Sequence, residues 1–203
     1  MRQISLPFDR PDRASGDEFL VSGANRLAVS HLERWRDWPL SVSVLSGPRL
    51  SGRSTLARHF SAASGATIID DAQTCEEQML FNAWNEAQTQ RRPLLMIADA
   101  PPTRWNVALP DLRSRLAAVP HVAIAEPDEA LAAALIERAL SCAGASYAAD
   151  LPDWLLRRIE RSYAAIAAVT RLLDEAALSS GRKISIAMAK EVLQSAGLLP
   201  IVP

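Results

Sequence analysis

The sequence predicts an α/β protein in which a reduced parallel sheet of about four strands is covered by helices and followed by a small all-α C-terminal part. Three observations support this prediction. Short apolar strands alternate with helical segments up to residue 126, a glycine-flanked turn joins the first strand to a helix, and only helical periodicity remains from Pro127 onward. Strands too apolar to face water, separated by helices, are typical of parallel sheets covered on both faces.

The expected elements follow one another in regular order. Residues 25–38 place Leu27, His31, Leu32, Trp35 and Trp38 on one helical face, with Pro39 as the stop. Strands are then expected within 41–46, 66–71, 94–99 and 121–127, and helices within 53–64, 76–90 and 109–119. Later helices are expected within 128–144, 151–162, 164–181 and 187–197, with ISI (184–186) as the one strand-like stretch.

Length and composition are those of an ordinary globular protein. The 203 residues are 49% hydrophobic and 22% charged, enough for one substantial core and a smaller appended one. We expect an extended arm over 1–18, an α/β core over 19–126 and a helical lid over 127–203. The net charge of −1 gives no overall cationic field for DNA. Cys75 and Cys142 match no metal or redox spacing, and no run could span a membrane, which indicates a cytoplasmic protein.

The segment GPRLSGRST, residues 47–55, nearly fits the phosphate-binding pattern G-x-x-x-x-G-K-[ST] between a strand and a helix. Gly47 and Gly52 allow a tight path, the helix N-terminus would point at phosphate oxygens, and Ser54, followed by Thr55, would hold Mg²⁺. The departure is Arg53 where lysine is expected. A guanidinium keeps the charge but prefers side-on bidentate pairing to the reach of an ammonium.

Acidic residues follow the next two strands. Asp70 and Asp71 end the second expected strand, where a phosphate-loop protein places the acids that bind Mg²⁺ and polarise water. The alternative is that the two aspartates cap the following helix. Asp99 ends the third strand, at the edge where ligands gather in open α/β sheets.

The N-terminal QISLPF is poor helix material, because Pro7 and Pro11 bound an apolar patch followed by charged residues. We expect it to be extended and exposed. It either folds back on its own domain through Ile4, Leu6 and Phe8, or docks on another protein.

Five segments of the chain together carry a family resemblance: GPRLSGRS, IIDDA, LLMIADAPPTRW, LPDLRSRL and the upstream FLVSGANRLAV. They resemble the AAA+ core of the bacterial replication initiator family (DnaA), and more closely its short regulatory homologues (Hda). The resemblance covers nearly all of residues 19–193, and LPDLRSRL is its most specific part. It implies that Arg115 is an arginine finger for a nucleotide on a neighbouring subunit and that Asp99 is a sensor-1 residue. Alternatively, Arg113 and Arg115 occupy a solvated helix face.

The resemblance also gives QISLPF a role. Regulatory members carry a similar peptide that docks on the replicative sliding clamp, so Gln3, Leu6 and Phe8 are the expected anchors, with Ile4 and Pro7 between them. Few deep apolar anchors suffice, because most interface energy lies in few residues.

Three departures from the family pattern bear on nucleotide chemistry. Arg53 replaces the lysine, and about eighteen positions between Gly52 and Asp70 leave room for only one helix and one strand, so the sheet is a strand short. The sensor-2 arginine is also missing from AAIAA (164–168), since Arg161 and Arg171 lie one turn to either side. We expect ADP or ATP with Mg²⁺ to bind weakly or not at all, and no ATP turnover by the chain itself.

The expected function is therefore regulation of replication initiation. The chain would dock on the sliding clamp and present Arg115 to the ATP-loaded initiator, promoting hydrolysis there. DNA would be contacted only through these partners, because no basic DNA-reading domain follows residue 203. Two alternatives stay open: an autonomous phosphate-loop ATPase, and a pure interaction module with a vestigial nucleotide site. Homo-oligomerisation also stays open.

Overall fold

The computed structural model describes residues 19–142 and 146–199, and the chain divides into two compact units between Ala125 and Glu126. The predicted clamp-binding residues Gln3, Ile4, Leu6, Pro7 and Phe8 lie outside the described residues. Within the described part, no helix is long and apolar enough to cross a membrane.

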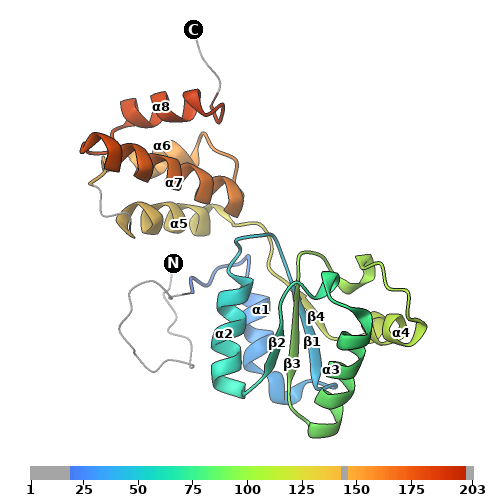
Figure 1. The fold of residues 1–203 in the computed structure, drawn as a ribbon. Helices are drawn as coiled ribbons and strands as arrows, with labels where there is room; N and C mark the ends of the chain where they lie inside the picture. The colour runs from blue at the N-terminus through green and yellow to red at the C-terminus, as the bar shows by residue number, and fades with distance from the viewer. Residues whose placement is uncertain (1–18, 143–145, 200–203) are drawn as a thin grey trace. The chain divides into compact units, whose positions relative to one another are not determined.

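The first unit is built on a four-stranded, all-parallel sheet with strand order β2-β3-β1-β4 (Figure 1). The strands are β1 (Val42–Ser46), β2 (Thr67–Ile69), β3 (Leu94–Ala98) and β4 (His121–Ala123). Every residue of the central strands β1 and β3 is buried, as expected where helices cover both faces. The predicted parallel sheet of about four strands is confirmed, and α2 and β2 alone fill the short interval between Gly52 and Asp70.

Helices lie on both faces of this sheet (Figure 1). They are α1 (Arg26–Glu33), α2 (Arg53–Ser64), α3 (Glu77–Gln90) and α4 (Pro110–Ala118), with 3₁₀ turns at Trp35–Asp37, Ala72–Thr74 and Pro102–Arg104. On one face, Val42, Val44 and Met96 pack with Leu80 and Trp84 of α3 and with Leu112 and Leu116 of α4. On the other, α1 and α2 contribute the fully buried Leu32, Leu56 and Phe60.

The first helix is shorter than predicted. α1 ends at Glu33, and Trp35 lies in a separate 3₁₀ turn, so the single helical face expected over 25–38 is wrong beyond Glu33. Trp38 then folds back: its indole N–H donates to the His31 carbonyl at 3.0 Å and its ring stacks on the His31 ring. The aromatic contact replaces the last helical turn.

The second unit is helical, with α5 (Glu129–Cys142), α6 (Leu151–Leu156), α7 (Tyr163–Ser180) and α8 (Ile186–Ser195) around one apolar core. The strand-like ISI forms no strand. Ile184 makes a single bridge to Tyr147, and the Ser185 hydroxyl accepts from the Met188 amide as the N-cap of α8. Capping by Ser185 outcompetes extension because it satisfies an otherwise open amide of the helix.

Candidate functional site

The predicted phosphate-binding loop connects β1 to α2 at the carboxyl ends of the strands. Gly47 begins it, and a Cβ at this position would lie 2.8 Å from the Ile124 carbonyl oxygen. Gly52 ends it with φ +85°, and a Cβ there would lie 2.8 Å from the Phe19 ring. Leu50 has a left-handed φ of 65°, which L residues other than glycine rarely adopt. Gly47 is therefore required by space and Gly52 chiefly by its positive φ, and the loop also holds one strained residue.

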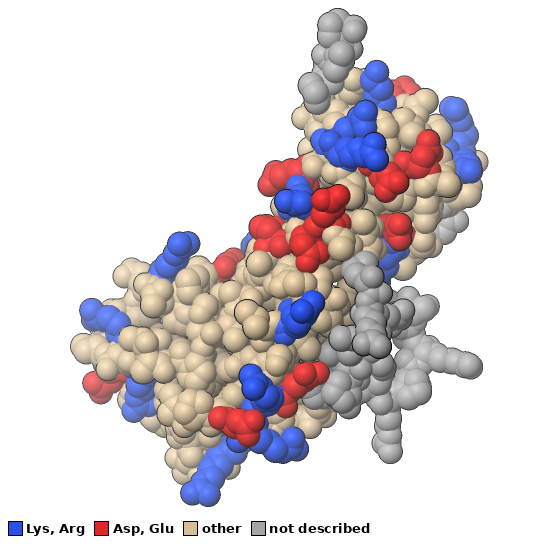
Figure 2. Space-filling view, turned by 180° about the vertical axis from the view of Figure 1, so that it is seen from behind, with Lys and Arg blue, Asp and Glu red and all other residues tan. Residues whose placement is uncertain are grey.

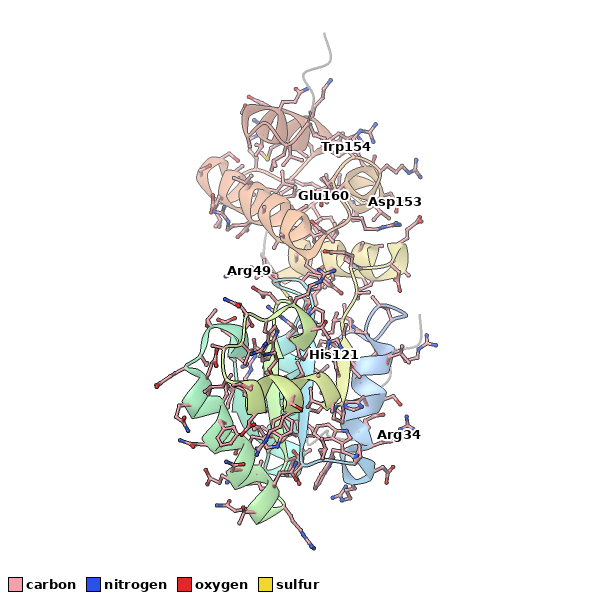
Figure 3. The ribbon with its side chains drawn as sticks, turned by 90° about the vertical axis from the view of Figure 1, so that its right-hand side faces the viewer. Arg34, Arg49, His121, Asp153, Trp154 and Glu160 are labelled. Carbon is pink, nitrogen blue, oxygen red and sulfur yellow. The ribbon has the colours of Figure 1, made fainter. Side chains whose placement is uncertain are left out.

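The start of α2 leaves its backbone donors open. Gly52 is its N-cap and offers no side-chain cap, so the first amides have no side-chain acceptor. Arg49 lies exposed in the same loop (Figure 3). Helix N-termini after such loops are where phosphate groups bind in proteins of this architecture.

Arg53 occupies the lysine position of the motif and is held by an aspartate. Its side chain is nearly buried, and Nη2 donates to Asp99 Oδ1 at 2.5 Å, so Asp99 at the end of β3 is its counterion. Nη1 of Arg53 is buried without a hydrogen-bond partner among the described residues, and so is the Ser51 hydroxyl. Unpartnered buried polar groups are uncommon in folded proteins. Both are donors in the loop and the first turn of α2, and an oxyanion is the acceptor that such donors lack, so these residues fit a phosphate group.

Ser54 and Asp70 also meet. The Ser54 hydroxyl donates to Asp70 Oδ2 at 2.8 Å, while Asp70 Oδ1 accepts the Asp71 amide at 2.9 Å. Asp71 precedes the 3₁₀ turn Ala72–Thr74, but its side chain makes no capping hydrogen bond there. The Thr55 hydroxyl accepts from Arg58 Nη2 at 3.2 Å. In the predicted set, Ser54 and Asp70 are thus the pair placed for a common cation.

A metal at this pair would need further ligands. Within the described residues, no three His, Cys, Asp or Glu side chains are arranged to hold a metal ion. Mg²⁺ is commonly bound by one or two protein oxygens together with phosphate oxygens and water. Ser54 and Asp70 therefore fit Mg²⁺ only in company with a nucleotide phosphate.

Arg115 makes its contacts elsewhere, on α3. Its Nη1 donates to Asn85 Oδ1 at 2.6 Å, and its Cζ lies 4.4 Å from the Phe81 ring centroid and 5.9 Å from that of Trp84. Arg113, on the same helix, is exposed and donates through Nη2 to the Ala108 carbonyl at 3.1 Å. The Arg115 guanidinium is thus half-exposed and held against a ring face.

Comparison with known proteins identifies the fold. No family model matches the sequence. Domain III of the Thermotoga maritima replication initiation protein DnaA superposes with a TM-score of 0.73 at 14% identity, covering 92% of this chain and 97% of that one. The replication initiator DnaA bound to AMPPCP and single-stranded DNA gives 0.61 at 16% identity, covering 81% of this chain and 66% of that one. The chain has a DnaA-like AAA+ fold.

The same fold extends to a second group of AAA+ proteins. A single-residue variant of Thermotoga maritima RuvB superposes with a TM-score of 0.64 at 14% identity, covering 88% of this chain and 70% of that one. The chain therefore spans nearly all of the isolated DnaA domain but just under two thirds of the longer initiator chain. At these identities the similarity concerns the AAA+ fold.

The AAA+ fold brings some of the predicted residues together and separates others. Arg53 meets Asp99 and Ser54 meets Asp70 at the carboxyl ends of the strands, whereas Arg115 contacts α3. Sequence analysis missed the α3 residues around Arg115 and the Phe19 ring at Gly52. The spacing of Phe81 and Asn85, four residues apart on one helix face, was the available signal.

Proposed function

We propose that the chain regulates bacterial replication initiation by docking on the sliding clamp through QISLPF and by presenting Arg115 to ATP bound by the replication initiator. The similarity of its fold to DnaA domain III supports the choice of partner, since AAA+ domains of like shape can pack against one another. The clamp-binding peptide rests on the sequence alone. In this proposal the chain works in the cytoplasm, and homo-oligomerisation is not required.

The observation that carries the proposal is the fixed position of Arg115. Arginine fingers act by placing a guanidinium where charge develops on a transferring phosphoryl group, and they are most effective when that position is set in advance. The contacts with Asn85 and Phe81 set it here, and among the described contacts Nη1 is the only Arg115 nitrogen in a hydrogen bond. The other donors stay available for a partner's phosphate.

For the chain's own nucleotide site we propose weak binding of ADP or ATP with Mg²⁺ and no independent turnover. Arg53 Nη1, the Ser51 hydroxyl and the first amides of α2 would hold phosphate, and Ser54 with Asp70 would hold Mg²⁺. A bound phosphate would share Arg53 with Asp99 and would lie near this carboxylate, which weakens the attraction.

Contact with DNA is proposed to be indirect. On the face drawn in Figure 2, basic and acidic side chains are interspersed on both units. The net charge of −1 is in keeping with this mixture. Without a continuous basic surface on that face, the clamp and the initiator would supply the contacts to the duplex.

The decisive experiment measures ATP hydrolysis by the initiator in the presence of clamp, DNA and this chain. Arg115→Ala should lower the stimulated rate about 10³-fold or more, in the range found for arginine fingers. Ser114→Ala, an exposed position on the same helix, is the control and should keep most of the stimulation. Unchanged stimulation with Arg115→Ala would refute the mechanism.

The clamp-docking step needs its own experiment. Purified clamp is titrated with the wild-type chain and with a variant carrying alanine at Gln3, Leu6 and Phe8. Binding that disappears in the variant supports docking through QISLPF. Equal binding by both proteins would assign the clamp contact to another part of the chain.

An autonomous ATPase is the second function, and the contact between Ser54 and Asp70 favours it. This alternative requires ATP turnover by the isolated chain that disappears in Ser54→Ala and Asp70→Asn. A basal rate that is absent, or that these substitutions do not change, would exclude it.

A further inference from the structure

A carboxylate on α3 holds the start of the helix that carries Arg115. Glu77 Oε1 accepts the Ala108 amide and Oε2 accepts the Leu109 amide, both at 2.7 Å. Leu109 is the N-cap residue of α4 and makes no side-chain cap, and Pro110 follows it in the first turn. The cap of α4 therefore comes from a residue about thirty positions earlier in the chain.

Charge strengthens this contact. A carboxylate at a helix N-terminus interacts favourably with the open amides and with the helix dipole. The pKa of Glu77 lies below its usual value, chiefly because the Ala108 and Leu109 amides stabilise the ionised form, with a smaller contribution from Arg113. Arg113 itself donates to the Ala108 carbonyl, so the residue before Leu109 is held at both its amide and its carbonyl.

The same face of α3 contacts α4 at two places. Glu77, Phe81 and Asn85 are spaced four residues apart and so follow one another along a single helix face. Glu77 fixes the start of α4, while Phe81 and Asn85 hold the guanidinium of Arg115, which lies in the last turn of α4. Because α4 has only nine residues, a change at its first turn alters the position of its last.

We propose that Glu77 is a positioning residue for Arg115: by capping α4 it sets the helix at the angle that brings the guanidinium onto Phe81 and Asn85. This inference rests on the proposed arginine-finger function of Arg115. Glu77 touches no reacting atom in this proposal and acts only through the placement of α4.

The first test measures hydrogen exchange at the Ala108 and Leu109 amides of the full chain. Glu77→Ala should speed exchange at both amides at least tenfold, and Glu77→Gln should have a smaller effect because one acceptor oxygen remains. Glu76→Ala is the control, since the Glu76 side chain is exposed and caps no helix. Unchanged protection in Glu77→Ala would overturn the proposed cap.

The second test separates positioning from simple structural damage. In the initiator assay, Glu77→Ala should lower the maximal stimulated rate about tenfold while the concentration giving half-maximal stimulation changes less than twofold. Glu77→Gln, which keeps the shape of the side chain, should fall between wild type and Glu77→Ala. Adding Glu77→Ala to Arg115→Ala should cause no further loss, because Glu77 acts only through Arg115.

The outcomes distinguish the two proposals. A rate lost with Arg115→Ala but kept with Glu77→Ala would overturn the positioning role alone. A further loss in the double variant would show that Glu77 acts by another route and would likewise overturn it. A rate unaffected by Arg115→Ala would overturn the proposed function, and the positioning role with it.

Discussion

Two regions of the first unit hold an arginine, and they hold it differently. In the loop 47–54, Arg53 has Nη2 on Asp99 but Nη1 buried without a partner among the described residues, and the Ser51 hydroxyl is likewise buried without one. On α4, Arg115 has its guanidinium over the Phe81 ring and Nη1 on Asn85, both from α3. The first region therefore keeps open hydrogen-bond donors, whereas in the second region side chains of α3 fix the position of the guanidinium.

The difference shows how surroundings give one residue type two uses. A buried guanidinium with an open nitrogen is suited to receive an anion, because the cost of burial is already met in part by Asp99. A guanidinium ordered on the surface is suited to be presented to another molecule, because little conformational entropy remains to be lost on contact. Substitutions in the two regions test this contrast, from the largest expected effect to the smallest.

The loop region should be most sensitive at Gly47. Gly47→Ala should lower the free energy of unfolding by about 2–4 kcal/mol, because a Cβ 2.8 Å from the Ile124 carbonyl oxygen forces β1 and the segment after β4 apart. Urea denaturation measures the loss. Gly65→Ala is the matched control: its Cβ meets nothing within 4 Å, so only the positive φ of 69° is penalised, at about 1 kcal/mol. Equal losses in the two variants would contradict the steric explanation.

Substitutions at the two partners of the Arg53–Asp99 ion pair should have unequal effects on the free energy of unfolding. Asp99→Ala should cost about 2 kcal/mol, because it leaves the buried Arg53 guanidinium without its counterion. Arg53→Met should cost only about 1 kcal/mol, because it removes the buried charge and leaves Asp99, which is partly exposed, to be hydrated. Thermal or urea unfolding of both variants measures the two losses of stability. A larger loss of stability in Arg53→Met than in Asp99→Ala would argue against a buried charge that needs a partner.

The α3–α4 region should lose less stability. Asn85→Ala should cost about 1 kcal/mol or less, in the range of a charged hydrogen bond. Phe81→Leu, which keeps an apolar side chain against the core and removes the ring, should cost about 1 kcal/mol, in the range of a cation–π contact. A double-mutant cycle with Arg115→Ala should show coupling of about 0.5–1 kcal/mol. Asn82→Ala is the control, since Asn82 bonds to Gln78 on the same helix. Absence of coupling at Phe81 and Asn85 would mean that Arg115 is not ordered by α3.

A smaller effect on stability is expected from pH, through His31 on α1 and His121 on β4. Burial lowers the pKa of His31 and of His121, and Arg34 and His121 lower that of His31 further. Figure 3 marks Arg34, the residue that follows α1, and His121 on β4. His31 Nε2 lies 2.8 Å from the Ser43 hydroxyl, which donates to the Pro120 carbonyl, so the ring nitrogen is the donor in this pair.

The sign follows from proton linkage. Because the folded pKa of both histidines is lowered, the unfolded chain binds more protons, and stability should fall as pH drops below about 6.5 towards the folded pKa values. His31→Gln and His121→Gln should each reduce this slope in urea denaturation between about pH 7.5 and 5. A slope unchanged in both variants would exclude these two residues as its source.

Sequence reasoning was most reliable where a local pattern is the cause of the structure. The glycines of the loop, the short interval between Gly52 and Asp70 and the alternation of strands and helices predicted a four-stranded parallel sheet, which is confirmed. The sequence-based prediction was wrong where a side-chain contact sets the local structure. Trp38 folds onto His31 instead of continuing the helix, and Ser185 caps α8 instead of extending a strand.

The sequence by itself determined that a glycine-flanked loop close to the phosphate-binding pattern follows the first strand, that acids follow the next two, and that Arg115 lies on a short helix. Each of these depends on residues close together in the chain, through backbone freedom, burial and helical periodicity. Only the tertiary structure decided that Asp99 is the partner of Arg53, that Phe81 and Asn85 hold Arg115, and that Glu77 caps α4. These contacts join residues about thirty or more positions apart, and their geometry depends on how the helices pack on the sheet, which no local pattern specifies.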